Sequence, residues 1–200
     1  MSARHLRYAI ETGERVFLRY PVPGDRDEFV ALRRNSRDHL DKWEPIPPSG
    51  LDTFSDAAFE LEYKTRKTAA QHRWLICTLD TGAIAGRITL GAIERGPFQN
   101  GRFGYWLGKA FTGKGHMREG LELAIRHSFS SLGLHRVCAN VMPSNEPSKK
   151  VLLRCGFTLE GYSKNYLQIR GAWKDHERYA LTVEDWNKMP TDRLSYDHDG

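Results

Sequence analysis

The segment from residue 103 to the helix that begins near position 116 limits the folds open to this chain more than any other part of the sequence. Residues 103–107 have the apolar and aromatic character of a β-strand, and residues 108–115 (GKAFTGKG) form a turn with three glycines. Apolar residues then recur at helical spacing, and Gly133 follows as a typical helix end: Met117, Leu121, Ala124, Ile125, Phe129 and Leu132. The segment predicts a strand, a glycine-rich turn and a helix.

This order of elements is suited to anion binding. The first N–H groups of a helix have no partner inside it, the helix dipole favours negative charge there, and glycines let a ligand approach the backbone closely. We therefore expect a phosphate-bearing ligand at the turn. The alternative is a structural connection that binds no ligand.

Two kinds of phosphate site fit the turn. Residues 108–114 match the spacing G-x-x-x-x-G-K of a nucleotide-triphosphate loop, but Gly115 stands where that loop has the Ser or Thr that holds magnesium. No later apolar strand ends in the Asp that would complete such a metal site. The sequence therefore does not favour an NTPase.

Composition and charge describe an ordinary folded domain. The chain has 200 residues, of which 40% are hydrophobic and 28% are charged, and this composition excludes a disordered chain. We expect one domain over residues 1–187 and a polar C-terminal tail over residues 188–200. The net charge of +5 mildly favours acidic partners.

Three features of the sequence bear on the compartment, on metal binding and on membrane contact. The three cysteines show no C-x-x-C spacing, which argues against a disulfide framework and a zinc site and fits a reducing cytoplasm. The eight histidines form no spaced pair on one helix, so we expect no metal. No run of about 18 apolar residues occurs, so we expect no contact with a membrane.

Periodicity predicts a mixture of strands and helices. Helices are expected around residues 29–40, from residue 52 onward, from residue 117 to 132, and over residues 145–154, where Asn145 is a capping residue. Strands are expected at residues 16–20, 74–79, 83–93, 102–107, 136–142, 157–161, 166–170 and 173–181. The chain is thus of the α/β (α+β) class.

Several short motifs resemble the Rim branch of the GNAT N-acetyltransferase superfamily, the ribosomal-protein N-terminal alanine acetyltransferases, and the RimJ type in particular. Thr112, Gly115 and Met117 fall on the coenzyme A turn of that superfamily, and Met is usual at the last position in this branch. The other motifs that carry the resemblance are Gly104-Tyr105-Trp106-Leu107, His135-Arg136, Asn145-x-x-Ser148, Cys155-Gly156-Phe157, Glu160-Gly161, Trp43-Glu44-Pro45, Arg95-Gly96-x-Phe98, Lys164-x-Tyr166-Leu167, Gly171-x-Trp173 and Asp175-His176.

The resemblance implies a GNAT fold and the use of acetyl-CoA. Its fold is a mixed, mostly antiparallel central sheet of six to seven strands flanked by helices, with two central parallel strands splayed apart, here at 103–107 and 136–141. Pantetheine would bind in the wedge between them, and pyrophosphate would bind on the backbone N–H groups of the turn. The coenzyme-binding residues implied are Tyr105, Trp106, Leu107, Thr112, Gly113, Lys114, Gly115, His116, Met117, Arg118, Asn145 and Ser148.

The resemblance also suggests which residues assist acetyl transfer. Ser148 matches the residue that serves the leaving thiolate in Rim-type enzymes, with an ordinary first-turn helical serine as the alternative. No base is self-evident, because Arg102 and Leu167 stand where relatives carry acidic residues. Glu44 is the favoured base, with Glu94 or a bound water as rivals, and Trp43, Glu44 and Tyr166 are expected to line the acceptor groove.

The acceptor is expected to be a primary amine, most simply the N-terminal α-amine of a ribosomal protein, acetylated directly in a ternary complex. An α-amine of pKa about 7.8 is already about 30% neutral near pH 7.4, so it needs no strong base. One alternative is a small amine such as an aminoglycoside, a polyamine or an amino acid. Another is an RNA-binding or ribosome-binding module with a vestigial coenzyme site. Nucleic acid is expected only indirectly, through the ribosome, and the sequence leaves the oligomeric state open.

Overall fold

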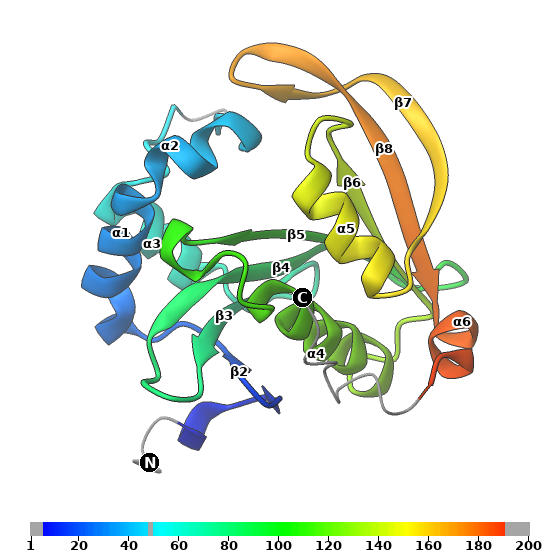
Figure 1. The fold of residues 1–200 in the computed structure, drawn as a ribbon, viewed down its shortest axis with the longest axis horizontal. Helices are drawn as coiled ribbons and strands as arrows, with labels where there is room; N and C mark the ends of the chain where they lie inside the picture. The colour runs from blue at the N-terminus through cyan, green and yellow to red at the C-terminus, as the bar shows by residue number, and fades with distance from the viewer. Residues whose placement is uncertain (1–5, 48–49, 191–200) are drawn as a thin grey trace.

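The computed structural model describes residues 6–47 and 50–190, which form a twisted sheet with helices on both faces (Figure 1). The strands follow the order β1-β2-β3-β4-β5-β6-β8-β7 across one eight-stranded sheet. Their bounds are β1 Glu11–Thr12, β2 Val16–Arg19, β3 His72–Thr78, β4 Ile84–Glu94, β5 Asn100–Leu107, β6 Arg136–Val141, β7 Thr158–Ile169 and β8 Ala172–Thr182. The helices are α1 Arg26–Asn35, α2 Arg37–Leu40, α3 Asp56–Lys64, α4 His116–Ser130, α5 Glu146–Arg154 and α6 Val183–Lys188, with short 3-10 turns between them.

The central pair β5–β6 is parallel, whereas every other pairing in the sheet is antiparallel. The two strands pair from Asn100 opposite Arg136 to Phe103 opposite Ala139, and pairing stops there. Beyond this point β5 runs on to Leu107 beside β4 alone, and β6 runs on to Val141 beside β8 alone. The predicted splay of two parallel strands is therefore present at the centre of the sheet.

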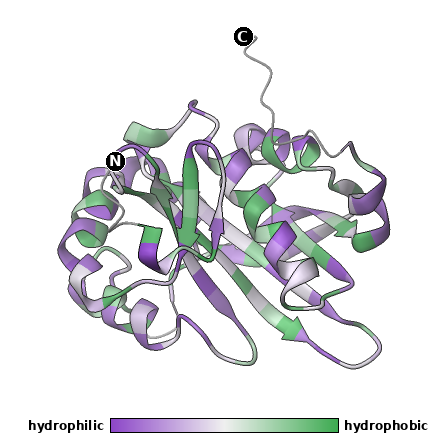
Figure 2. Ribbon diagram, turned by 90° about the horizontal axis from the view of Figure 1, so that it is seen from below, coloured by the Kyte–Doolittle hydropathy of each residue, from purple (hydrophilic) through white to green (hydrophobic). Residues whose placement is uncertain are grey.

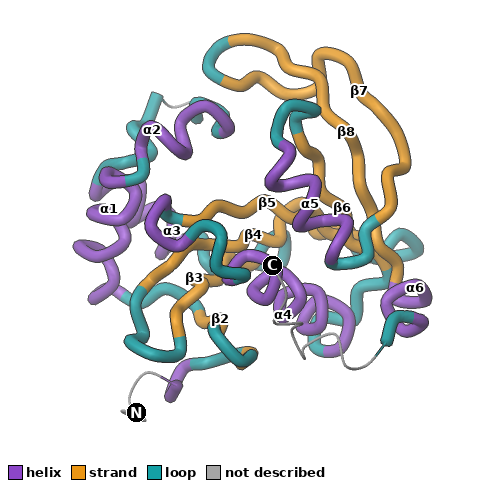
Figure 3. The backbone as a smooth tube through the Cα atoms, viewed as in Figure 1, coloured by secondary structure: helices purple, strands orange, loops and turns teal. Residues whose placement is uncertain are grey.

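Two hydrophobic clusters fill the two faces of the sheet. Figure 3 shows the helices that cover it, with α1 and α3 apart from α4. On one face, Leu121 and Ile125 of α4 pack against strand residues such as Ile76 and Ile88. On the other face, Phe29 of α1 and residues of α3 pack over β2 to β5. Figure 2 shows hydrophobic residues concentrated along the central strands. Burial of this apolar surface on both faces is what holds the layers together.

Close packing fixes the turn between β5 and α4. A Cβ added at Gly108 would lie 2.3 Å from a methyl carbon of Leu32, so only glycine allows α1 to approach the turn this closely. At the far end of the turn, Glu119 of α4 is fully buried and accepts hydrogen bonds from the backbone N–H groups of Arg15 (2.8 Å) and Val16 (3.3 Å). The start of α4 is thereby tied to β2.

The hairpin β7–β8 extends beyond the rest of the sheet and curves toward α2 (Figure 1). The strands expected at 157–161 and 166–170 are one strand, β7, whose pairing with β8 shifts register near Gly161 and between Ser163 and Leu167. Arg170, just after β7, forms an ion pair with Asp41, which begins the 3-10 turn Asp41–Trp43 after α2. The hairpin thus contacts the segment that follows the first two helices.

Three details differ from the sequence-based expectation. The sheet has eight strands and not six to seven, because β1 adds an edge and the irregular hairpin remains part of the same sheet. The helix expected around 29–40 is divided at Ser36, whose hydroxyl accepts a hydrogen bond from the N–H of Lys109 at 3.0 Å. In addition, α6 continues the chain to Lys188.

Two further expectations concern the C-terminal tail and helices that could span a membrane. The expected polar tail at 188–200 lies outside the described residues from 191 onward. No helix within the described segments has the length and hydrophobicity needed to cross a membrane.

Candidate active site

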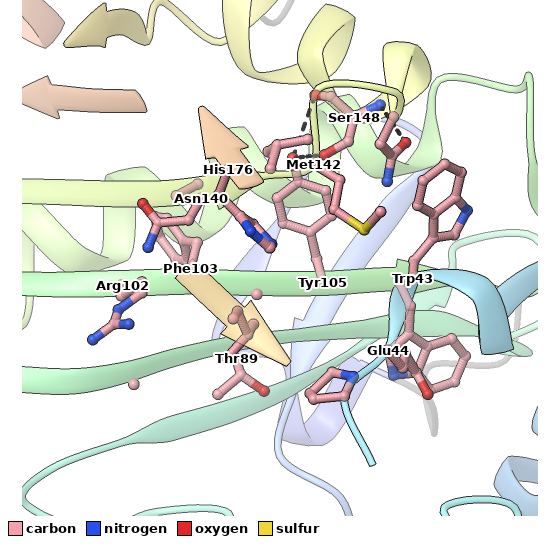
Figure 4. Close-up of a pocket in the computed structure, with 18 of the residues that line it drawn as sticks. Trp43, Glu44, Thr89, Arg102, Phe103, Tyr105, Asn140, Met142, Ser148 and His176 are labelled. Atoms are coloured by element: carbon pink, nitrogen blue, oxygen red, sulfur yellow. Dashed lines mark hydrogen bonds between the residues drawn. The ribbon is translucent and has the colours of Figure 1, made fainter. Parts of the chain in front are cut away.

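A cavity of about 480 Å³ lies where β5 and β6 separate (Figure 4). Its floor comes from β3, β4 and β5, and its walls come from the segment after α2, from β6 and the start of α5, and from the β7–β8 hairpin. Gly104 of β5 leaves the floor open, because a Cβ placed there would meet no atom within 4 Å. The cavity therefore keeps open space beside Gly104.

Tyr105 and Ser148 form one side of this cavity. The hydroxyl oxygen of Tyr105 lies 2.8 Å from the hydroxyl oxygen of Ser148, a hydrogen bond between the end of β5 and the first turn of α5 (Figure 4). Burial raises the pKa of Tyr105 well above its ordinary value, although the hydrogen bond with Ser148 opposes this shift. The phenol stays protonated at neutral pH and can act as a hydrogen-bond donor inside the cavity.

Asn145 has the structural role that its sequence position predicts. Its side-chain oxygen accepts a hydrogen bond from the N–H of Ser148 at 3.3 Å and so caps the N-terminus of α5. Asn145 also lines the cavity. The cap aligns the first turn of α5 and holds Ser148 beside Tyr105.

Trp43 and Glu44 form the wall at the other end of the cavity from Arg102 (Figure 4). Both carboxylate oxygens of Glu44 accept hydrogen bonds from the guanidinium of Arg33, at 3.1 and 2.6 Å. Arg33 is 4% exposed, also donates to the carbonyl of Thr53, and lies over the ring of Trp106. Glu44 is thus part of a bidentate ion pair that fixes the wall to the floor.

The hairpin supplies Tyr166 and His176. The hydroxyl of Tyr166 accepts a hydrogen bond from the side-chain amide of Asn140 at 2.8 Å, and its ring centroid lies 5.5 Å from that of His176. His176 lines the cavity although only 3% of its surface is exposed. Its Nδ1 lies 3.0 Å from the carbonyl oxygen of Lys174, so Nδ1 donates and Nε2 retains a lone pair in the neutral ring.

The glycine turn lies outside the cavity, at the N-terminus of α4. Gly113 and Gly115 have φ values of +74° and +78°. Residues that carry a Cβ rarely adopt this left-handed conformation. Residues 112–115 are exposed, and no side chain caps the helix. These features fit a diphosphate that would complete the hydrogen bonds of the first helical N–H groups. Burial lowers the pKa of His116 at this helix start, with a further lowering from Lys114.

The residues expected to act in the site fall into two groups. Seven of them line the cavity: Trp43, Glu44, Tyr105, Trp106, Asn145, Ser148 and Tyr166. The remaining coenzyme residues end β5 or belong to the turn and the first turn of α4: Leu107, Thr112, Gly113, Lys114, Gly115, His116, Met117 and Arg118. Met117 points into the core, and Arg118 donates to Glu122 at 3.1 Å. Glu94, the rival base at the end of β4, is not among the lining residues.

Other lining residues were not expected from the sequence. Arg73 and Arg87 form the cavity floor, and His176 lies in its wall. The sequence signal for His176 is its place in the Asp175-His176 motif, which does not indicate that the ring reaches the cavity. The described residues contain no cluster of three or more His, Cys, Asp or Glu side chains with the geometry of a metal site.

Comparison with known proteins identifies the family. A family model described as an acetyltransferase (GNAT) domain matches residues 15–158. The chain therefore belongs to the GNAT acetyltransferase family, and it is an acetyl-CoA-dependent N-acetyltransferase. Within this family it is similar to the [ribosomal protein uS5]-alanine N-acetyltransferase of Escherichia coli, with 33% identity over 181 residues that cover 88% of this chain and 91% of the relative.

Solved structures agree with this assignment. RimJ of Mycobacterium smegmatis, in complex with CoA-disulfide, superposes with a TM-score of 0.82 and is 30% identical, covering 90% of this chain and 88% of its own. A spermidine N-acetyltransferase of Vibrio cholerae shares the fold, with a TM-score of 0.72 over 86% of this chain and 98% of its own, but only 22% identity. The expected RimJ-like GNAT fold is thus confirmed.

Proposed function

We propose that this enzyme transfers an acetyl group from acetyl-CoA to the N-terminal α-amine of a protein, with a ribosomal protein as the first candidate. The observation that carries the proposal is the cavity at the strand split, which joins the Tyr105–Ser148 pair to the wall formed by Trp43 and Glu44. The E. coli relative with this activity matches nearly the whole chain and supports the choice of acceptor. We place the reaction in the cytoplasm, within a single catalytic domain over residues 1–187.

Acetyl-CoA would supply the acetyl group as a thioester. The exposed turn with Gly113 and Gly115 would hold its diphosphate, with Lys114 near the negative charge. The unpaired backbone edges of β5 beyond Phe103 and of β6 beyond Ala139 would bind the arm that reaches the cavity.

The amine needs a proton acceptor. The amine nitrogen attacks the thioester carbonyl carbon, the carbon–sulfur bond breaks, and one amine proton must leave as the amide forms. We propose that Nε2 of His176 takes this proton, because Nδ1 is held by the Lys174 carbonyl and the ring lines the cavity. Glu44, the base expected from the sequence, is the rival, but both of its oxygens already accept from Arg33.

The thiolate that leaves needs a proton donor. Tyr105 is held protonated by burial and shares a hydrogen bond with Ser148, so one hydroxyl can pass its proton to the thiolate as it takes the proton of the other, and the pair regains a proton from solvent. A thiol has a pKa of about 8.5, so the thiolate is a good leaving group and the donor has a modest effect on rate.

The test offers the purified enzyme labelled acetyl-CoA with three acceptors: peptides that begin with alanine, the same peptides with a blocked N-terminus, and spermidine. Mass spectrometry should place one acetyl group on the free α-amine. Acetylation of spermidine alone, or acetylation confined to lysine side chains of the blocked peptides, would overturn the proposed acceptor.

A further inference from the structure

Two arginines on adjacent strands form the floor of the acceptor side of the cavity. Arg73 of β3 and Arg87 of β4 belong to neighbouring strands in which Arg73 pairs with Thr89 and Arg87 pairs with Leu75. The Nη1 atoms of both donate to the same oxygen of Glu62, Oε2, at 2.6 Å each. Glu62 belongs to α3 and is only 4% exposed. One buried carboxylate therefore faces two guanidinium groups.

Most of the hydrogen-bonding capacity of this pair is unused. A guanidinium has five N–H donors, and among the described residues each of these two groups makes one hydrogen bond, with Glu62. The Nε atoms of Arg73 and Arg87 and Oε1 of Glu62 are buried without a partner among the described residues. About a fifth of each arginine side chain remains exposed, at 20% and 21%, and both line the cavity. The exposed parts of the two guanidinium groups can therefore donate to an incoming anion.

The charges of the residues that line the cavity also favour an anion. Its lining contains Arg73, Arg87 and Arg102. Glu44 is the one carboxylate among the described lining residues, and its charge is matched by Arg33. Glu62 offsets one of the two floor arginines, so positive charge remains in excess. A polycationic amine would be repelled here, whereas a carboxylate would be attracted.

We propose that Arg73 and Arg87 form an anion subsite that binds a side-chain carboxylate of the acceptor. The inference rests on the proposed function and specifies its substrate class: α-amines followed within the first few residues by Asp or Glu. The subsite recognises the acceptor by charge and by hydrogen bonding. It thereby separates peptide acceptors from polyamines.

Strand geometry sets the distance between the subsite and the reacting amine. Arg87 pairs with Trp106 on β5, next to the strand split, and Arg73 lies one strand farther away. Neighbouring strands are about 4.8 Å apart, so the subsite lies about 5–10 Å from the split. An extended chain advances about 3.3 Å per residue, which places the carboxylate on roughly the second to fourth residue. The carboxylate of a free amino acid is too close to its own amine to reach the subsite.

The experiment compares three peptides that differ only at positions three and four, all with a free N-terminal alanine: Glu-Glu, Gln-Gln and Lys-Lys. We expect kcat/KM for the Glu peptide to exceed that for the Gln peptide by about tenfold or more, because charge-assisted hydrogen bonds are lost in the latter. The Lys peptide should be the poorest acceptor. Raising the salt concentration should reduce the differences.

Variants assign the preference to the two arginines. Arg87→Gln and Arg73→Gln should each bring the Glu and Gln peptides closer in kcat/KM, whereas Arg26→Gln, which alters an exposed arginine on α1, should retain the full ratio. If a floor variant fails to fold, the peptide series and its salt dependence on the unaltered enzyme still test the proposal.

The outcomes separate the two proposals. Equal acetylation of all three peptides would overturn the subsite and leave the proposed function standing. Failure to acetylate any of them, with spermidine acetylated, would overturn the proposed function itself.

Discussion

The hydroxyl oxygens of Tyr105 and Ser148 lie 2.8 Å apart, although the two residues are 43 positions apart in the chain. Their contact joins the end of β5 to the first turn of α5, at the point where β5 has lost its pairing with β6. In the proposed reaction, this contact would lie on the leaving-group side of the cavity.

Tyr105→Phe and Ser148→Ala should each lower kcat by about tenfold, since each removes one half of a proton-donating pair. The double variant should lose less than the product of the two single effects, because residues that act as a unit are not additive. Steady-state kinetics with a free alanine peptide measures both. Tyr162→Phe, which removes a hydroxyl bound to Asp175 on the hairpin, is the matched control and should retain kcat. Full activity of Ser148→Ala and Tyr105→Phe would remove this pair from the mechanism.

His176→Gln should lower kcat by about 100-fold if the imidazole accepts the amine proton, since general base catalysis contributes effects of this size. The amide of Gln preserves polarity but cannot take up the proton.

Glu44→Gln is the comparison for His176→Gln. It weakens the ion pair with Arg33, so its main effect should be a lower unfolding midpoint and a higher KM for the acceptor, with kcat nearly retained. If kcat fell about 100-fold in Glu44→Gln and were retained in His176→Gln, the base would be Glu44.

Gly113→Ala should weaken the binding of acetyl-CoA by about tenfold, as measured by calorimetry, because a side chain at positive φ distorts the turn where the diphosphate would bind. Gly133→Ala is the matched control. Both glycines have positive φ, +74° and +63°, and a Cβ at either meets no atom within 4 Å. Both variants should lose about 1 kcal/mol of stability. An unchanged affinity in Gly113→Ala would disprove the placement of the diphosphate.

Folding stability should fall as the pH is lowered from about 6.5 toward 4. Burial is the main cause that lowers the pKa of His72 to about 4, and His127 and Lys67 add to the effect. The unfolded chain, in which histidine has its ordinary pKa of about 6.5, binds the proton first as the pH drops, so protonation favours unfolding in this window. Above pH 6.5 this source of stability is fully present.

Thermal unfolding between pH 4 and 7.5 measures this dependence. His72→Gln should flatten the slope between pH 4 and 6.5 even though it also disturbs the hydrogen bond of Nδ1 with the hydroxyl of Tyr20, at 2.5 Å. A slope that is the same in the variant would assign the pH dependence to other groups.

Local patterns predicted much of the fold. The helix spacing from Met117, the glycine turn and the two strand patterns around residues 80–82 depend on neighbours in the chain, and each is found close to its expected bounds. The break at Ser36 was not predictable in this way, because it depends on Lys109, a residue 73 positions away. The two-residue strand β1 is too short to give a periodic signal.

The site residues also divide into those that a local pattern predicts and those that depend on the tertiary structure. The residues on one continuous motif, such as Asn145 and Ser148, could be placed from sequence. The ion pair of Glu44 with Arg33 depends on how separate elements meet, and no local pattern predicts it. The contact of His176 with Lys174 is local to β8, but the place of the ring beside Tyr166 in the cavity wall depends on the tertiary structure. Glu44, the base predicted from sequence, is paired with Arg33, and its role in the reaction stays a prediction.

The contact of Asp41 with Arg170 links the segment after α2 to the tip of the hairpin, beside Trp43 of the cavity wall. Asp41 is half-buried and Arg170 is exposed, so this ion pair adds little stability and weakens further as salt is added. If the proposed acceptor enters between these two elements, salt should therefore loosen the entrance as well as screen the arginines inside.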